Sequence, residues 1–582
     1  MGTHDAVNWP LFTWLRMPGF EVTLDVRLDG LACWLLALTV IVLLLVLSAW
    51  PKGKPKGWLW LACLGVLLAD VAGNLGQLFF GWTLSAWASS ELARRTVVQG
   101  PAFRPVWLVQ RASDMALLGG FGLIWMNFES ASMRFSAWTP EAIAALRPEL
   151  VESIALCVLI GVIGRCAQLP LTVWLETEAG FAARTGNSMA KLSDEMVGVW
   201  NVPAGHQVAE RLQADPQQHW HETVDESVPT TVMAWWLCAA FLPVGIGVLV
   251  RFEPLFAVAS HTRLLMVAVG AFTLLMCSAN AVAQNDWPRV LGQIAVGQCG
   301  LVLVALGIGT PEPVAAALNC FVWQCVAFAV LLVSERPRSR AVTLALLCCA
   351  SGLWGRHVLM DLVWTHADQE MHPTDSGSLV FGATESRVWL LVVVLMSVAE
   401  LLTSLALVRA WFLRRRERRD VESASSAAIW SSRGIVGLLI VGGAGFGWAF
   451  QTAHPPLLGL GPMLPLSAAG MVLAWWMYSK PSSLPEKVSA AMGPFARLSR
   501  NRFYWDDLYF LLVVHPAKVI GDWLSWFDER VLGNGVCVLR SRLAKSLGES
   551  AEPLTEGSAK IGTLTTLSSV AVLAWVLLWL RS

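Results

Sequence analysis

Charged residues are scarce in this sequence of 582 residues, because Asp, Glu, Lys and Arg together make up only 14% of it. An ordinary soluble domain carries about 25% charged residues, so the composition excludes a soluble protein. The 42 basic residues balance the 42 acidic residues, and the net charge therefore gives no attraction to nucleic acid. Tyrosine is also rare, with three residues against 31 tryptophans. Trp side chains near the ends of apolar runs are typical of membrane interfaces, so we expect a lipid bilayer as a partner and no nucleic acid.

Closely spaced thiols are missing as well. Twelve cysteines are scattered through the chain without a CxxC pair, and the nearest pairs are Cys348 with Cys349 and Cys320 with Cys325. A zinc or iron-sulfur site needs more closely grouped thiolates. The HWHE run at 219–222 is more typical of a solvated loop than of a metal site. We therefore expect no cofactor, no metal and no redox centre on this chain.

Long apolar runs are abundant from one end of the chain to the other. Runs of about 17 to 25 residues are long enough to cross a hydrocarbon core of about 30 Å as helices. They predict an all-α polytopic membrane protein with about fourteen transmembrane helices. The candidate spans are 32–50, 58–73, 76–92, 112–128, 152–175, 230–250, 261–283, 288–308, 313–334, 340–357, 387–412, 432–451, 458–478 and 562–580.

The basic loops predict the orientation of these spans. The run RRRERRD at 414–420 and the other basic loops fall on one side if every span is real, and basic loops remain in the cytoplasm. The N-terminus and the acidic loop 359–386 are then expected outside. The start of the chain has no basic region followed by an apolar run, so no cleavable signal peptide is expected.

Two polar or amphipathic segments interrupt the pattern. Residues 181–228 carry charges, prolines and three histidines, and residues 507–560 alternate apolar and charged positions at helical spacing, as amphipathic helices on a membrane or partner do. The expected division is an external N-terminal segment 1–31, membrane domain 32–180, polar loop insertion 181–228, remaining membrane domain 229–480, lateral amphipathic helix 502–560 and final transmembrane helix 561–582.

Several motifs occur in the order found in one known family. GRCAQLPLTVWL at 164–175 is similar to GKSAQLPLxxWL, LVQRASD at 108–114 to a segment ending in TRVGD, and QNDWPRVLGQIAVGQCG at 284–300 to QTDIKRVLAYSTxSQxG. RFYWDDLYFLLVVHPAKVI at 502–520 is similar to the FYVDELYDxxxVRP segment that precedes a long lateral helix. These motifs resemble the antiporter-like, proton-translocating subunits of respiratory complex I, and specifically chain L of NADH-quinone oxidoreductase.

The resemblance covers nearly the whole chain and lacks only the family's first two helices. It implies antiporter-like inverted repeats, with helices broken near Pro170 and near Gly352 to Gly355. It also implies a multi-pass protein of the bacterial cytoplasmic (inner) membrane. Its partners would be other membrane subunits of a complex I-like assembly.

The charged residues of the family's proton relay are mostly replaced in this chain. A family glutamate, three histidines and three lysines align with other residue types, and a shift of one residue would put Gln324 at one lysine position. The aligned residues are Thr83 for the glutamate; Leu237, Ala317 and Phe321 for the histidines; and Arg165, Cys325 and Arg356 for the lysines.

These replacements predict an impaired relay. A proton relay needs groups that gain and lose a proton near neutral pH, whereas an arginine side chain is not deprotonated in proteins. Some polar residues remain, and they are either structural ion pairs or parts of a water or ion path. The candidate proton-path or ion-pair residues are Arg111, Asp114, Arg165, Arg356, His357, Asp361 and Glu400, with Asp114 able to pair with Arg111 or Arg165.

Three functions remain open from the sequence. The preferred one is a chain L-like membrane subunit of a complex I-type NADH-quinone oxidoreductase, with its own proton relay impaired. The second is a subunit of a non-respiratory transporter, such as an inorganic-carbon uptake complex or a cation/proton antiporter. The third is a membrane scaffold that anchors a peripheral partner through the loop 181–228.

Overall fold

The structure is a computed structural model, and its described residues fall into two units, Met1–Asp506 and Asp507–Ser582, which are treated separately below. The described residues are 7–17, 20–50, 56–96, 103–127, 134–172, 236, 240–285, 287–333, 359, 362–363, 383–417, 463–479, 483–500, 502–505, 508, 511–512, 515–528, 530, 542 and 545.

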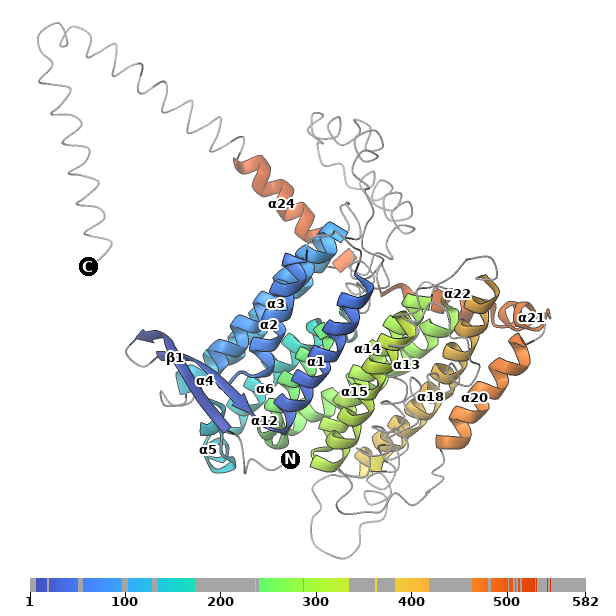
Figure 1. Ribbon diagram of the computed structural model, residues 1–582, viewed down its shortest axis with the longest axis horizontal. Helices are drawn as coiled ribbons and strands as arrows, with labels where there is room; N and C mark the ends of the chain where they lie inside the picture. The colour runs from blue at the N-terminus through green and yellow to red at the C-terminus, as the bar shows by residue number, and fades with distance from the viewer. Residues whose placement is uncertain are drawn as a thin grey trace, which may run out of the picture. The chain divides into compact units, whose positions relative to one another are not determined.

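The first unit is mostly helical and begins with a β-hairpin (Figure 1). The hairpin consists of β1 (Val7–Met17) and β2 (Phe20–Leu28). The first group of helices is α1 (Gly30–Ala49), α2 (Gly57–Asp70), α3 (Leu75–Thr96), α4 (Phe103–Asn127), η3 (Phe135–Ala137), α5 (Pro140–Ala144) and α6 (Pro148–Arg165). The remaining helices are α11 (Leu242–Arg251), α12 (Glu253–Val258), α13 (Ser260–Ala283), α14 (Trp287–Ile308), α15 (Pro311–Val333), α18 (Ala383–Glu417), α20 (Met463–Tyr478), α21 (Leu484–Ala491), α22 (Gly493–Arg500) and η6 (Arg502–Tyr504).

Glycines allow the long helices to pack closely. Helix α2 packs on α3, α13 on α14, and α18 on both α13 and α20. A Cβ at Gly65 would lie 2.4 Å from the backbone nitrogen of Ser85, and a Cβ at Gly270 would lie 2.4 Å from the carbonyl oxygen of Gly300. Helices in a bilayer associate through such small residues, because lipid gives no hydrophobic drive for association. Gly65 therefore fixes the distance between α2 and α3, and α3 carries Trp82 and Ser85, which contact Arg165.

Arginines bind carbonyl groups at the ends of two of these helices. The last carbonyls of a helix have no partner within it, and a cation there also complements the negative end of the helix dipole. Arg251 donates to the carbonyl of Asp70, the last residue of α2, over 2.6 Å. Arg409 on α18 donates to the carbonyl of Gln284, which follows α13, over 2.5 Å. Contacts between residues more than 100 positions apart thus close these helix ends.

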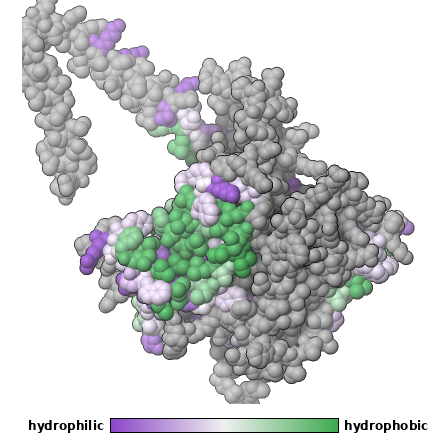
Figure 2. All heavy atoms as spheres, viewed as in Figure 1, coloured by the Kyte–Doolittle hydropathy of each residue, from purple (hydrophilic) through white to green (hydrophobic). Residues whose placement is uncertain are grey.

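Within the described residues, three helical stretches are long and apolar enough to cross a membrane, judged by length and composition. They are Ser260–Ala283, Arg289–Ile308 and Val388–Leu413. Shorter apolar helices cover Gly30–Leu44, Gly57–Asp70 and Leu242–Arg251. Apolar side chains also gather on the described surface over the first helices (Figure 2). Exposed examples are Trp60 and Leu64 on α2, Phe80 and Trp87 on α3, and Met115 and Leu118 on α4.

Two sequence expectations are wrong. The chain is not entirely helical, because residues expected to form an external segment fold as the antiparallel hairpin β1–β2. Aromatic and β-branched residues in alternation favour strands, and the Pro18-Gly19 pair between the two runs is typical of a turn. The span expected at 152–175 is shorter, because α6 ends at Arg165.

Several expectations lie outside the described residues. They are the spans at 340–357, 432–451 and 562–580, the polar loop 181–228 and the break near Gly352 to Gly355. In the second unit the structure describes one longer helix, α24 (His515–Phe527), inside the segment expected to be the lateral helix. Its side chains Ile520, Trp523, Leu524, Trp526 and Phe527 are exposed.

Candidate site at the broken end of α6

Helix α6 ends in a motif that turns the chain inside the bundle. The amide of Gln168 donates to the carbonyl of Ile163, and the amide of Ala167 donates to the carbonyl of Gly164. These two bonds, with Ala167 in the left-handed conformation at φ 51°, define a Schellman cap. Pro170 follows it and cannot continue a helix, because it lacks an amide hydrogen. The break expected near Pro170 is therefore present, and it places Arg165 on the last turn of α6.

Neighbouring helices hold the segment that follows this cap. The side-chain amide of Gln168 donates to the carbonyls of Cys166 and Val296 over 2.9 and 3.1 Å. The backbone amide of Leu169 donates to the hydroxyl of Thr273 over 3.1 Å. Backbone outside a helix is tolerated at membrane depth only where protein or water satisfies its polar groups. Helices α13 and α14 provide those partners here.

The Arg165 side chain is enclosed by aromatic rings and helix-bound oxygens. Only 2% of the residue is exposed. Its Cζ atom lies 3.5 Å from the ring centroid of Phe241 and 4.6 Å from that of Trp82. Its two terminal nitrogens donate to the Ser85 hydroxyl over 2.5 Å and to the Trp82 carbonyl over 3.3 Å. Aromatic faces attract a cation most strongly where water is excluded, so this setting suits a planar and permanently charged guanidinium.

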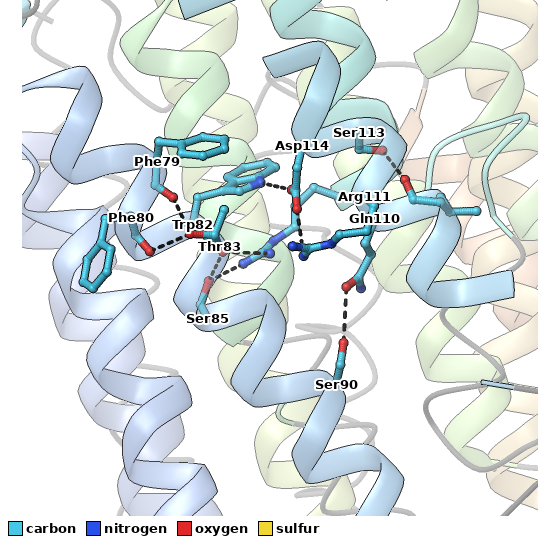
Figure 3. Close-up of polar contacts among 12 residues, drawn as sticks. Phe79, Phe80, Trp82, Thr83, Ser85, Ser90, Gln110, Arg111, Ser113 and Asp114 are labelled. Atoms are coloured by element: carbon cyan, nitrogen blue, oxygen red, sulfur yellow. Dashed lines mark hydrogen bonds and ion pairs between the residues drawn. The ribbon is translucent and has the colours of Figure 1, made fainter. Parts of the chain in front are cut away.

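Asp114 accepts a hydrogen bond from the side chain of the same tryptophan (Figure 3). The indole nitrogen of Trp82 donates to Oδ1 of Asp114 over 2.6 Å. The other carboxylate oxygen lies 2.7 Å from Nη2 of Arg111, one turn earlier on α4. Of the two pairings left open for Asp114, the ion pair with Arg111 forms. Arg165 and Asp114 are instead connected through Trp82, whose carbonyl accepts from Arg165 and whose indole nitrogen donates to Asp114. The alternative pairing of Asp114 with Arg165 is not formed.

Thr83 stands at the position of the family's glutamate, and its hydroxyl is used within α3. It donates to the carbonyls of Phe79 and Phe80 over 2.9 and 3.1 Å (Figure 3). Such a bond to the preceding turn is a common solution for Thr in a helix. A hydroxyl in this arrangement cannot supply the negative charge that a glutamate would place beside Arg165.

Helix α15 carries three of the other replaced relay positions, whereas Leu237 and Arg356 lie outside the described residues. Ala317, Phe321 and Cys325 are all buried there. Gln324 is buried as well, and among the described residues its amide group has no hydrogen-bond partner. A buried amide can orient a water molecule, but it does not titrate. These residues do not restore a relay on α15.

Glu400 lies in a second polar region, between α13, α18 and α20. It is buried, and the hydroxyl of Ser467 on α20 donates to its Oε1. One turn further along α18, the hydroxyl of Thr403 lies 2.8 Å from that of Ser278 on α13. The expectation that Glu400 lies deep inside its helix agrees with this burial. Its role stays a prediction.

The structure also shows a partly buried ionic cluster that sequence reasoning missed. Arg251 donates to Oδ2 of Asp29 over 3.2 Å, and Arg27 donates to the same oxygen over 2.9 Å. Asp29 also caps α1 by accepting from the amide of Ala32. Burial alone would raise the pKa of Asp29, but the charge of Arg251, the Ala32 amide and the charge of Arg27 together hold this pKa below its ordinary value of 3.8. Because Asp29 and Arg251 are 222 positions apart, no local pattern could have revealed their pairing.

The remaining candidate residues are Arg356, His357 and Asp361, and they lie outside the described residues. Their roles stay predictions. Among the residues that the structure does describe, no group of three or more His, Cys, Asp or Glu side chains is placed to hold a metal ion.

Comparisons with known proteins bear on the fold. A family model described as "NADH:quinone oxidoreductase/Mrp antiporter, TM" matches residues 210–371. Among solved structures, the Mrp complex from Dietzia sp. DQ12-45-1b gives a TM-score of 0.62 at 16% identity, covering 90% of this chain and 55% of that chain. Respiratory complex I from Thermus thermophilus gives 0.53 at 15% identity, covering 81% of this chain and 89% of that chain. The chain has the antiporter-like membrane fold.

Two curated relatives carry the same name. "NADH-quinone oxidoreductase subunit L" of Buchnera aphidicola (subspecies Acyrthosiphon pisum) is 25% identical over 342 residues, covering 56% of this chain and 46% of the relative. The protein of the same name from Neisseria meningitidis serogroup A is 21% identical, covering 99% of this chain and 91% of the relative. The match to the Buchnera protein thus spans about half of that relative's length. The resemblance to chain L that the sequence motifs indicated is confirmed.

Proposed function

We propose that this chain is a chain L-like membrane subunit of a complex I-type NADH-quinone oxidoreductase. In this proposal it lies in the bacterial cytoplasmic membrane, with about fourteen spans in inverted repeats and an external N-terminus. Redox groups belong to other subunits, and this chain contributes helices and a lateral segment within 502–560 that contacts neighbouring membrane subunits. The subunit L names of the relatives and the antiporter-like fold support the proposal.

The proposal includes an interrupted proton relay. The surroundings of Arg165 are the observation that supports this interruption. A relay residue must release its proton, and a guanidinium does not. Two aromatic rings, a hydroxyl and a carbonyl surround Arg165. Its neighbour Thr83 has its hydroxyl bound to α3. Arg165 is therefore a fixed charge that connects α3, α6 and the start of α11.

Purification of the tagged, full-length chain from its native membrane tests the assignment. We expect the other chains of an NADH-quinone oxidoreductase to purify with it, together with NADH-dependent quinone reduction. The chain could instead purify with a large zinc-binding soluble protein, or with antiporter subunits and without NADH oxidation. Either result would contradict the proposal and would favour a non-respiratory transporter. The likeness to the Mrp complex keeps that second candidate in view.

A further inference from the structure

Asp70 is a buried carboxyl group that takes no part in the arrangement around Arg165. It is the last residue of α2, and only 3% of it is exposed. The hydroxyl of Thr39, a buried residue of α1, donates to its Oδ2 over 3.0 Å. A carboxylate removed from water loses free energy unless hydrogen bonds and a cation offset its charge. The contacts of Asp70 therefore decide which form of the acid this site holds.

The nearby arginines serve a different carboxylate. Arg27 and Arg251 both bind Oδ2 of Asp29, over 2.9 and 3.2 Å. Arg251 reaches Asp70 as well, but it donates to the backbone carbonyl and not to the carboxyl group. In the described part of the chain, no arginine or lysine lies within ion-pair distance of the Asp70 carboxyl group. Thr39 is thus its closest polar side-chain partner there.

The position of Asp70 at the end of α2 also disfavours a negative charge. The last carbonyls of a helix form the negative end of its dipole, where an anionic side chain is destabilised. A neutral carboxyl group avoids this repulsion. The hydroxyl of Thr39 can accept a hydrogen bond as well as donate one, so its 3.0 Å contact with Oδ2 also suits a protonated acid.

The charges around this end of α2 do not balance. The described titratable or charged groups there are Asp25 and Arg27 on β2, Asp29 at the start of α1, Cys63 and Asp70 on α2, and Arg251 on α11. The polar side chains from α1 and the start of α3 are Thr39, Asn74 and Gln77, which do not titrate. Three carboxyl groups therefore meet two guanidinium groups, and one bound proton restores neutrality.

We propose that Asp70 and Thr39 form a proton-binding site, in which Asp70 is a neutral acid at pH 6. This site lies outside the positions that align with the family's relay. When Asp70 gives its proton to water, the resulting carboxylate competes with Asp29 for Arg251, which already holds the Asp70 carbonyl. Protonation of Asp70 thus stabilises the contact that joins the start of α1 to α11. The proposal does not depend on which complex the chain joins.

Infrared spectroscopy of the purified full-length chain tests this proposal. The C=O stretch of a protonated carboxyl group is separate from the bands of a carboxylate, and it shifts in heavy water. At pH 6 we expect Asp70→Asn to lack one protonated-carboxyl band that wild type shows. Asp29→Asn is the matched control, because Asp29 is held by two arginines. It should lose carboxylate absorption instead.

Thermal unfolding gives a second readout at the same pH. An amide resembles a neutral acid in shape and charge, so Asp70→Asn should unfold within about 2 °C of wild type. Asp29→Asn should unfold at a lower temperature, because it loses an ionised partner of Arg251. If Asp70→Asn does not fold, Thr39→Val replaces it. That variant should keep the protonated-carboxyl band but move it to higher frequency, since the acid loses a hydrogen bond.

Three results would overturn the proposal. Loss of carboxylate absorption in Asp70→Asn would show that the acid is ionised, and a response of those bands to replacing sodium by choline would assign a metal cation to the site. Loss of the protonated-carboxyl band in Asp25→Asn, and not in Asp70→Asn, would place the proton on Asp25. An unchanged spectrum in Thr39→Val would remove Thr39 from the site.

Discussion

Arg165 and Arg251 are both buried cations, yet their surroundings differ. The described partners of Arg165 are two aromatic rings, a hydroxyl and a carbonyl, whereas Arg251 binds the carboxylate of Asp29 and the carbonyl of Asp70. In these contacts, removing Arg165 takes a cation away from neutral groups. Removing Arg251 leaves a partly buried negative charge. The comparison shows that the consequence of losing a buried charge depends on what remains after the charge is gone.

The largest effect is expected for Arg251→Ala. Breaking a buried ion pair by removing one partner typically costs about 3–5 kcal/mol, because the other charge stays buried. The Asp29 side chain is 22% exposed and keeps its contact with Arg27, so we expect a loss of folding free energy near the lower end of this range, about 3 kcal/mol. Denaturant unfolding of the purified chain in detergent measures it. Arg27→Ala is the control, because Arg27 binds the same Asp29 oxygen but its side chain is 13% exposed against 4% for Arg251. Equal losses in the two variants would show that burial does not separate them.

A smaller loss is expected for Arg165→Ala. It removes cation–π contacts worth about 2 kcal/mol when water is excluded, but leaves no uncompensated carboxylate among its described partners. Arg165→Lys keeps the charge and loses the flat stacking surface and one of the two donor nitrogens, so it should fall between wild type and Arg165→Ala. The same unfolding experiment measures all three proteins. A lysine variant as stable as wild type would show that charge alone matters at this position.

Ser85→Ala should cost less again, about 1–2 kcal/mol, because it removes one hydrogen bond to a charged group. Thr83→Val is the matched control two residues earlier on α3. Its hydroxyl bonds only to carbonyls of its own helix in the described contacts, so its removal should change the folding free energy by less than about 0.5 kcal/mol. If Thr83→Val were the more harmful change, the Ser85 contact would not be the one that holds Arg165.

The smallest effect concerns pH and Asp29. Its pKa in the folded chain lies below the ordinary value of 3.8, so ionised Asp29 contributes stability that is fully present above that value. The contribution is lost as pH falls through the folded pKa. The folding free energies of wild type and Asp29→Asn should therefore differ at pH 6 and converge as the pH falls below 3.8. A difference that grows as the pH falls would have the opposite sign and would contradict the pairing of Asp29 with Arg251.

Sequence patterns predicted the membrane class and most described helices, because apolar length is a local property. They also predicted the break near Pro170, and they gave the ion pair of Arg111 with Asp114, three residues apart on one helix, as one of two pairings open to Asp114. The motifs indicated the antiporter-like fold through their order along the chain. Each of these features can be recognised from neighbouring residues or from linear order.

The features that sequence reasoning missed depend on tertiary contacts. The hairpin was overlooked because Pro10 and two register shifts interrupt the strand pattern of β1. The partners of Arg165 come from residues 76 or more positions away, and Phe241 carried no motif that marked it. A carboxylate was expected beside Arg165 because an unpaired cation is costly in a membrane, and aromatic faces with helix oxygens provide a different solution.

The role of Arg165 is tested most directly by measuring proton uptake in vesicles that hold the purified assembly, with wild-type chain or with Arg165→Ala. A fixed structural charge predicts less assembled complex in the variant, but unchanged proton uptake for each NADH oxidised by the complex that does assemble. Full assembly of the variant together with abolished proton uptake would contradict this account and would make Arg165 part of a working relay.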